Sequence, residues 1–402
     1  MASDEQLFRL IRAARGINVD DEAFANDERL PLPCFPLNSS HFYLPHCDDE
    51  QSKEISSSWQ SPDSFHRELC NRIRSAKQRV ILATLYVGAA NSASAVKEEE
   101  LLGALEDAAS NNVPTVKVLM DASRGSRPLP LAGDGKPTTC SAEAVHNRLH
   151  LGDSIRMATP HSSGVFLFNV LPPMKSALLP SPLNEVAGVF HMKAYVIDDC
   201  LILSGANLSE EYFTTRQDRF IIFQNGAGGL VDFYANLIDS LCAASHQFSV
   251  DAETRKYRLT EPEISVNALL KELERTFRCA LEHSVPVDWD GDDSGDLQRS
   301  EYDSFIVPTF QIPSNYIGGS HCKLSFLCDT QATHALLSEA SRIEGTSVRL
   351  ASAYLNPPAS LLSILAKFGS QDMEPSLINR AFLLTASPES HGFAPKKGEK
   401  CK

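Results

Sequence analysis

The chain has 402 residues, of which 43% are hydrophobic and 22% charged, values typical of a globular protein with room for two domains. Its formal net charge of −14 is not offset by any basic block, which argues against nucleic-acid binding. No run approaches the roughly 18 uninterrupted apolar residues of a membrane-spanning helix.

The first 58 residues are predicted to form an N-terminal extension, because prolines and serines interrupt them as they do loops. A short amphipathic helix is predicted at its start, either a targeting or membrane-surface helix or a frayed N-terminal helix. The acidic residues Asp4, Glu5 and 20–22 contradict a transit peptide. The predicted apolar face is Leu7, Phe8, Ile11 and Ala14, and the arginines on another face are Arg9, Arg12 and Arg15.

The next part of the chain alternates predicted helices and strands. A helix over 65–76 leads into a strand over 80–86, and a helix over 97–110 leads into a strand over 116–120. This alternation predicts an α/β fold with a parallel-type sheet. A further helix over 229–245 is predicted to close the first domain.

The most informative segment contains His191, Lys193 and Asp198 in the spacing H-x-K-x-x-x-x-D. A strand is predicted over 190–197, and side chains two apart on a strand share a face. His191 and Lys193 are therefore expected to project together, while Asp198 falls in the turn before the apolar run 201–203. An imidazole beside an ammonium suits attack on a phosphate, since the nitrogen is the nucleophile and the lysine holds the anionic oxygens.

A His-x-Lys pair alone also fits a buried strand histidine beside a lysine, and the residues that follow favour the phosphate site. Asn207 ends a turn of small residues after the second strand, where its amide can donate to a phosphate oxygen. Asp218 precedes a strand over 220–223. Its carboxylate is a candidate to accept a hydrogen bond from the second ring nitrogen of His191 and fix the tautomer.

Two other patterns are interpreted as non-functional. His321, Cys322, Cys328 and His334 fit no common closed zinc site, so no metal is expected. The stretch 133–138 lacks the first glycine of a nucleotide-phosphate loop and is read as a surface turn.

The set His191, Lys193, Asp198, Asn207 and Asp218 resembles the H-K-D half-site of the phospholipase D superfamily. The run that contains it is similar to the eukaryotic mitochondrial phosphatidylglycerophosphate synthase family. This resemblance covers about residues 64 to 393 and implies a bilobal fold of two pseudo-repeated α/β sandwich lobes. Further matching stretches are 85–88, 124–127, 159–161 and 184–188.

An internal repeat supports two lobes of one design. The segment 348–354 repeats the pattern of 80–86, and 382–387 repeats that of 118–123. The predicted division is an extension over 1–58, a first lobe with the H-K-D motif over 59–247, and a partial second lobe over 248–402.

A second half-site is expected to be absent from this chain. The only other His-x-Lys, at His321, precedes the first strand of the second lobe rather than following its second strand, and its aspartate comes one place late. We interpret it as a decoy and the second lobe as incomplete.

The resemblance implies transfer of a phosphatidyl group from CDP-diacylglycerol to glycerol 3-phosphate through a phosphohistidine, giving phosphatidylglycerophosphate and CMP for the phosphatidylglycerol and cardiolipin pathway. No cofactor and no nucleic acid are implied, and the expected location is the surface of the mitochondrial inner membrane. The implied catalytic residues are His191 as nucleophile, Lys193 for charge stabilisation, and Asp198. Asn207 is implied to support charge stabilisation and Asp218 to orient the imidazole. Arg124 and Arg127 are candidates to hold a substrate phosphate, or else solvated loop arginines.

Two alternatives stay open. The first alternative is another phospholipase D-type enzyme, either a phosphodiesterase or a cardiolipin synthase-like transferase. The second is a non-catalytic lipid-binding remnant. Because a complete site needs a second histidine as general acid and base, this form is expected to be weakly active or inactive.

Overall fold

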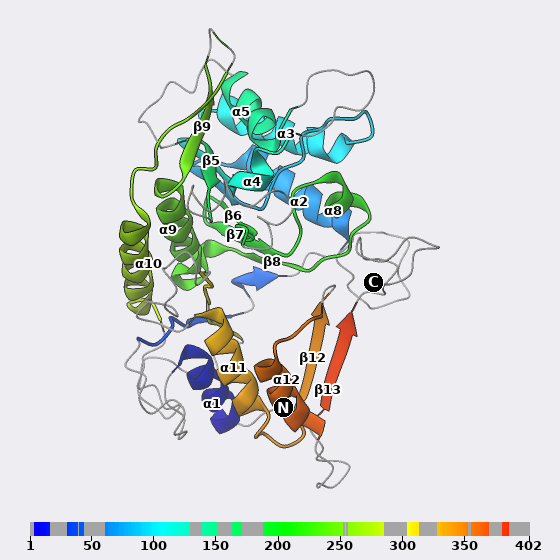
Figure 1. Cartoon of the computed structure of the whole chain (residues 1–402), viewed down its shortest axis with the longest axis vertical. Helices are drawn as coiled ribbons and strands as arrows, with labels where there is room; N and C mark the ends of the chain where they lie inside the picture. The colour runs from blue at the N-terminus through cyan, green and yellow to red at the C-terminus, as the bar shows by residue number, and fades with distance from the viewer. Residues whose placement is uncertain are drawn as a thin grey trace.

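The computed structural model describes residues 4–16, 30–38, 40–43, 61–128, 139–151, 163–170, 188–251, 254, 256–284, 304–312, 328–352, 355–369 and 380–385. Within these ranges, a large unit is built on a nine-stranded sheet with helices on both faces. A smaller unit, formed by segments from both ends of the chain, lies beside it (Figure 1). The predicted positions 133–138, 159–161, 184–187, 321–323, 353–354 and 386–387 lie outside the described residues.

The large sheet is mixed, and its strand order is β10-β9-β5-β4-β3-β6-β7-β8-β2. Only the β3–β4 and β4–β5 pairs are parallel, so the parallel-type sheet expected from the sequence is limited to three strands. Strands β6, β7 and β8 are antiparallel neighbours; a two-residue turn joins β6 to β7, and a longer segment that contains helix α8 joins β7 to β8. The strands are β2 (Phe42–Tyr43), β3 (Arg79–Ala83), β4 (Thr115–Asp121), β5 (Gly164–Phe168), β6 (Ala194–Ile197), β7 (Cys200–Ser204), β8 (Phe220–Phe223), β9 (His246–Val250) and β10 (Tyr257–Leu259).

The alternation of side chains along the strands divides the interior into two cores. Val80 and Leu82 of β3 face the helical layer of α2, α3, α5 and α8, whereas Ile81 and Ala83 face α9 and α10. Each face of the central strands is therefore covered, as an α/β sheet requires. The helices are α2 (Pro62–Ser75), α3 (Val96–Ser110), α5 (Ser141–Leu151), α8 (Glu210–Thr214), α9 (Leu230–Ala243) and α10 (Val266–Leu281).

Segments outside the predicted first lobe complete the large unit. Strands β9 and β10 extend the sheet, and α10 packs on α9, although β10 and α10 follow the boundary predicted at residue 247. Strand β2, from the predicted extension, pairs with β8. These elements pack as part of the large unit. The predicted division of the chain into an extension and two lobes remains a prediction.

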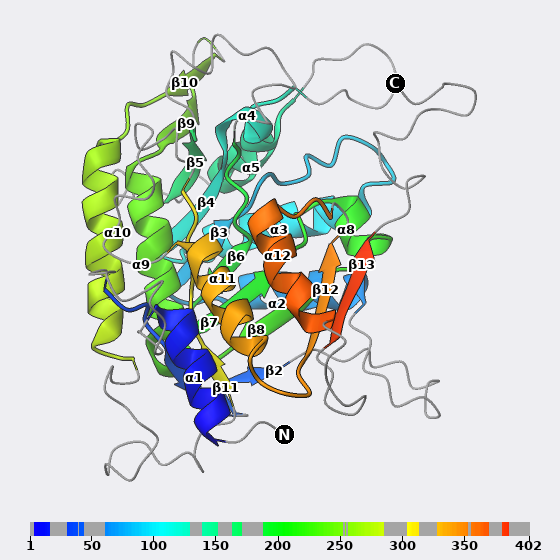
Figure 2. The same cartoon turned by 60° about the horizontal axis from the view of Figure 1, so that its bottom comes forward.

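The N-terminal helix α1 (Asp4–Arg15) lies against α11 (Asp329–Ala340) of the smaller unit (Figure 2). Ile11 is buried in a small cluster, and the guanidinium of Arg15 is buried and donates to the carbonyl oxygen of Leu32 at 2.9 Å. The apolar side of this amphipathic helix thus packs against the rest of the protein. Nearby, β1 (Phe35–Leu37) pairs with β11 (Ser304–Ile306).

The smaller unit repeats the element order of the larger one. Helix α11, strand β12 (Ser347–Ser352), helix α12 (Ala359–Ala366) and strand β13 (Arg380–Thr385) follow one another as α2, β3, α3 and β4 do. The β12–β13 pair is parallel, like the β3–β4 pair, which agrees with the internal repeat in the sequence.

The remaining helices of the described residues are short. In the large unit they are α4 (Ala122–Gly125) and η1 (Asn225–Gly229), and in the smaller unit η3 (Lys367–Gly369).

None of the helices in the described ranges combines the length and the apolar character needed to cross a bilayer.

The turn between β6 and β7 is fixed by Asp198, which has a left-handed backbone with φ of 50°. Its carboxylate accepts hydrogen bonds from the backbone N–H groups of Lys77, Gln78 and Arg79 at 2.9, 2.7 and 3.0 Å. Its own N–H donates to the carbonyl oxygen of Arg79 at 2.9 Å. Asp198 thus locks the start of β3 to the end of β6, because an aspartate tolerates the left-handed conformation and accepts several donors.

Replacing Asp198 with alanine is expected to lower the free energy of unfolding by about 1–3 kcal/mol, because three donors lose their acceptor and a β-carbon without local hydrogen bonding is held at positive φ. Asp198→Asn, which keeps one oxygen and tolerates the conformation, should lose less. Urea unfolding measures both, with Asp199→Ala at the exposed neighbour as the control. Equal unfolding midpoints for Asp198→Ala and the wild type would contradict this role.

Candidate active site

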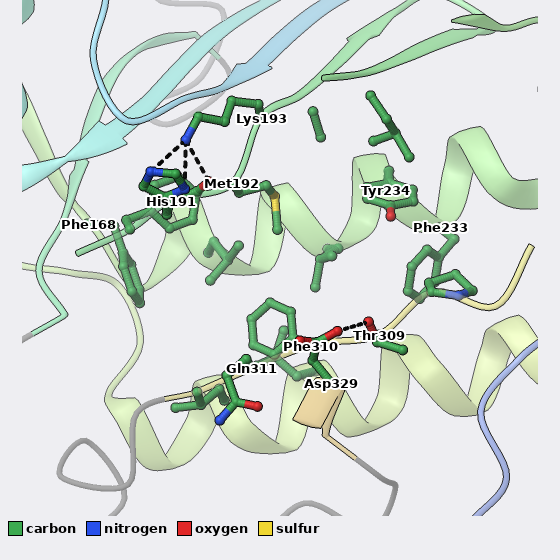
Figure 3. Close-up of a pocket in the computed structure, with 18 of the residues that line it drawn as sticks. Phe168, His191, Met192, Lys193, Phe233, Tyr234, Thr309, Phe310, Gln311 and Asp329 are labelled. Carbon is green, nitrogen blue, oxygen red and sulfur yellow. Dashed lines mark hydrogen bonds between the residues drawn. The ribbon is translucent and has the colours of Figure 1, made fainter. Parts of the chain in front are cut away.

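His191 and Lys193 lie immediately before β6, in the segment that leads into the centre of the sheet. The predicted strand over 190–197 begins only at Ala194, so neither residue is in the strand itself. Their side chains nevertheless project together, as the spacing predicts (Figure 3). Nζ of Lys193 lies 2.8 Å from Nδ1 and 3.1 Å from Nε2 of His191, and it donates to the His191 carbonyl oxygen at 3.0 Å.

The two groups have shifted proton affinities that suit a nucleophile and its cationic partner. Burial lowers the pKa of Lys193 to about 8, and the charge of Asp218 partly opposes this shift. The pKa of His191 is also lowered, first by burial and then by the positive charges of Lys193 and Arg124, while Asp121 acts in the opposite direction. Near neutral pH the imidazole is therefore uncharged and the ammonium is still largely protonated.

Asp121, at the end of β4, holds the backbone beside His191, and sequence reasoning did not single it out. One carboxylate oxygen accepts the N–H groups of Ser123 and Arg124 at 2.9 and 3.0 Å, and so begins helix α4. The other accepts the N–H of Phe190 at 2.8 Å. Asp121 is only 3% exposed. An aspartate at the carboxyl end of a strand in an α/β sheet was the available signal, since such ends meet at binding sites.

Asp218 acts on Lys193 in this structure. No hydrogen bond joins it to His191 within the described residues, so the expected fixing of the imidazole tautomer by Asp218 is not observed. Its carboxylate packs against Gly205, where an added β-carbon would lie only 2.5 Å from Oδ1 of Asp218. A glycine is therefore required in the turn after β7 for this carboxylate to approach.

The remaining predicted residues are distributed around the pair. Asn207 is buried, and its Oδ1 has no hydrogen-bond partner in the described part of the chain; it makes no bond to His191 or Lys193. Arg124 lies on α4, close enough for its charge to lower the pKa of His191, whereas Arg127 follows that helix and is half-buried. Asp198 lies at the other end of β6, roughly 20 Å along the chain from His191.

Of the residues considered for zinc, His321 and Cys322 lie outside the described ranges. Cys328 precedes α11, and its Sγ lies 3.3 Å from Oε1 of Gln331, to which it donates. In the part of the chain that the structure describes, no group of three or more histidine, cysteine, aspartate or glutamate side chains is arranged to hold a metal ion.

A cavity of about 560 Å³ opens beside the His191–Lys193 pair. It runs between β6 and β7 on one side and α9 and α10 on the other, and the segment 308–312 forms a further wall (Figure 3). Most of the side chains that line it are aromatic or aliphatic. The arrangement offers a nucleophile and a cation at one end of an apolar space.

Comparisons with known proteins agree with this geometry. Residues 69–241 match the family described as cardiolipin synthase, PLD-like domain. This range is similar to the phospholipase D superfamily. A Haemophilus influenzae phosphatidylserine synthase crystal structure has the same α/β fold, with a TM-score of 0.53, 18% identity, and coverage of 95% of this chain and 70% of that one. The phospholipase D-like fold class expected from the sequence is confirmed.

Two curated relatives in this superfamily carry the name CDP-diacylglycerol–glycerol-3-phosphate 3-phosphatidyltransferase, mitochondrial. The chicken protein is 27% identical over 395 residues, which cover 91% of this chain and 61% of the relative. The human protein is 28% identical over 366 residues, which cover 84% of this chain and 58% of the relative. This phospholipase D-like chain thus spans about three-fifths of the length of the curated relatives it matches.

Asp121→Asn is expected to lower the pKa of His191 further, because it removes the negative charge that opposes the other shifts. It should also speed hydrogen exchange at the Phe190 amide, because the asparagine retains only one acceptor oxygen for its several donors. NMR titration and amide exchange measure the two effects. Asp107→Asn, an exposed carboxylate on α3, is the control. An unchanged His191 titration would show that the charge of Asp121 does not affect the pKa of His191.

Asp218→Asn is expected to move the titration of Lys193 below pH 8, because the carboxylate that raises its pKa is gone. At pH 8 the protonated fraction should fall about twofold for a shift of half a unit, while at pH 6 it should stay nearly complete. Lysine-selective NMR follows the titration, with Asp199→Asn as the control. A midpoint that rises or stays constant would contradict the coupling.

Proposed function

We propose that this chain provides a catalytic half-site for phosphatidyl transfer from CDP-diacylglycerol to glycerol 3-phosphate, forming phosphatidylglycerophosphate and CMP. The observation that carries the proposal is the neutral imidazole of His191 against the buried ammonium of Lys193, at the end of an apolar cavity. The names of the chicken and human relatives specify this donor and acceptor. Since these relatives are mitochondrial by name, we propose a mitochondrial location at the surface of the inner membrane.

In the first step, a ring nitrogen of His191 attacks the phosphorus that carries the diacylglyceryl group. The bond from phosphorus to the bridging oxygen of CMP breaks, and CMP leaves with that electron pair. A phosphatidyl group is then bonded to the histidine nitrogen. Lys193 donates to a non-bridging oxygen, a contact of the kind that is worth about 3–4 kcal/mol in the transition state. Arg124, near His191, is proposed to hold a second phosphate oxygen.

In the second step, the sn-1 hydroxyl of glycerol 3-phosphate attacks the same phosphorus, and the bond to the histidine nitrogen breaks. A base must take the hydroxyl proton, and an acid must have protonated the departing CMP. Among the described residues, His191 is the only histidine that lines the cavity. We therefore expect residues 1–402 alone to turn over slowly, with the acid–base group supplied in addition to this half-site.

The anchoring residues have supporting roles in this proposal. Asp121 positions the His191 backbone through Phe190, and Asp218 keeps Lys193 protonated by raising its pKa. Asn207, with its buried and unpartnered oxygen, is a candidate to orient a substrate or a neighbouring donor. Asp198 acts through the fold rather than through the substrate, because its carboxylate is committed to three backbone donors.

His191→Ala is expected to abolish CMP release and covalent labelling, a loss of at least 10³-fold, because the nucleophile is gone. The assay uses CDP-diacylglycerol labelled in the phosphatidyl phosphate, quenched without acid, and counts CMP released and label retained per chain. His334→Ala, on α11 and away from the cavity, is the control for loss of a half-buried histidine.

The acceptor decides between this proposal and the two alternatives. Transfer of the label to glycerol 3-phosphate supports phosphatidylglycerophosphate synthesis. Transfer to phosphatidylglycerol or to water indicates a cardiolipin synthase-like transferase or a phosphodiesterase. Lipid binding without any labelling, unchanged by His191→Ala, indicates a non-catalytic lipid-binding protein.

A further inference from the structure

The cavity beside His191 extends well beyond the reacting groups. Its deep walls come from elements on the α9 and α10 side of the sheet, and they carry no charge. Leucines and phenylalanines dominate this part, and several belong to the second hydrophobic core. The deep-wall side chains are Leu203, Phe233, Leu237, Leu241, Leu273 and Phe277.

Few of the groups that line the cavity can carry a charge. His191 and Lys193 form one end, and Asp329 lies on the wall made by the start of α11. Asp329 is already engaged, because Thr309 Oγ1 donates to its Oδ1 at 2.6 Å. Within the described residues, no other ionisable side chain except the phenol of Tyr234 faces this space. The cavity is thus amphipathic along its length, with a cationic end and an apolar interior.

Such a space is neither a packing defect nor a nucleotide site. Protein interiors contain few voids larger than a water molecule, and about 560 Å³ lies within the range of ligand sites. A cytosine base would leave several donors and acceptors without partners among leucine and phenylalanine side chains, which is costly. A hydrocarbon chain needs no partners and gains by leaving water.

We propose that this cavity binds one acyl chain of the phosphatidyl donor, with the donor's phosphate held at the His191–Lys193 end. This inference rests on the proposed function and adds where the lipid lies. It also places the CMP group outside the cavity, on the solvent side of the pair. Chain length and shape at the deep walls then contribute to substrate selection.

The smaller unit holds one wall of this site in place. The carbonyl oxygen of Phe310 accepts the N–H of Asp329 at 3.0 Å, and Thr330 donates through its hydroxyl to Oε1 of Gln311 at 3.2 Å. The wall segment 308–312 is therefore attached to the first turn of α11. Phe310 is half-buried and presents its ring to the cavity (Figure 3).

The test measures binding by isothermal titration calorimetry, without need for turnover. The ligands are dihexanoyl and dioctanoyl phosphatidic acid, below their micellar concentrations, and glycerol 3-phosphate, which has no acyl chain. Each buried methylene should tighten binding up to about fourfold, so dioctanoyl phosphatidic acid should bind about tenfold more tightly than the dihexanoyl lipid. Equal affinities of the wild type for the two lipids would overturn the proposal.

Leu203→Trp fills the cavity from β7 and should reduce the dioctanoyl advantage to less than about twofold, with glycerol 3-phosphate binding unchanged. Ile221→Trp is the matched control, because Ile221 is the direct partner of Leu203 on β8, is likewise half-buried against the same core, and does not line the cavity. Phe310→Ala, at the half-buried wall, tests the same site with less risk to folding and should weaken dioctanoyl binding about three- to tenfold.

Equal effects of Leu203→Trp and Ile221→Trp, with Phe310→Ala binding both lipids normally, would overturn the acyl-chain site. The two proposals fail separately. If Leu203→Trp removes the chain-length effect but the protein is never labelled, the acyl-chain site is supported and the proposed phosphatidyl transfer is refuted. Labelling of His191 with no chain-length effect does the reverse.

Discussion

The buried ammonium of Lys193 is the constraint on which the rest of this site depends. Burial removes it from water and lowers its pKa to about 8, and the compensation comes from Asp218 and from the carbonyl oxygen of His191. Burial lowers the pKa of the His191 imidazole, and the ammonium that it contacts lowers that pKa further, so the cation helps to keep the imidazole uncharged. A more exposed lysine would stay charged over a wider pH range, but water would screen its electrostatic interaction with His191 and with a bound phosphate.

The fold keeps this arrangement in place through carboxylates at both ends of one strand. Asp121 ties the residue before His191 to the end of β4, and Asp198 ties the turn after β6 to the start of β3. Both act by accepting backbone N–H groups, which fixes the main chain rather than a mobile side chain. Between them β6 lies in the middle of the sheet, with a core on each face, so His191 directly precedes a strand that is buried on both sides.

The cavity connects this site to the smaller unit. Helices α9 and α10 provide its deep walls, but the segment 308–312 is fixed by the start of α11, and α11 in turn packs on the N-terminal helix. Residues as far apart in the sequence as Phe168 and Asp329 therefore meet around one amphipathic space. Such a space suits a substrate with a phosphate at one end and a hydrocarbon chain at the other.

The sequence by itself determined the phospholipase D-like α/β fold class and the fact that His191 and Lys193 lie together. These followed from local patterns, namely a two-residue spacing and the alternation of helices and strands, which depend on neighbouring residues alone. It also predicted α2, α3, β4 and α9 within a few residues, and the repeat of the β3 and β4 segments in β12 and β13.

Only the tertiary structure decided which carboxylate serves which group. Asp218 raises the pKa of Lys193 and makes no bond to His191. Asp198 anchors a turn far from the imidazole. Asp121 ends a strand 70 residues before His191 and binds the backbone next to it. The mixed sheet, the packing of α1 on α11 and the cavity are likewise products of long-range contacts. Such contacts leave no periodic signal, because the distance between two residues in a sheet depends on strand order rather than on their separation in sequence.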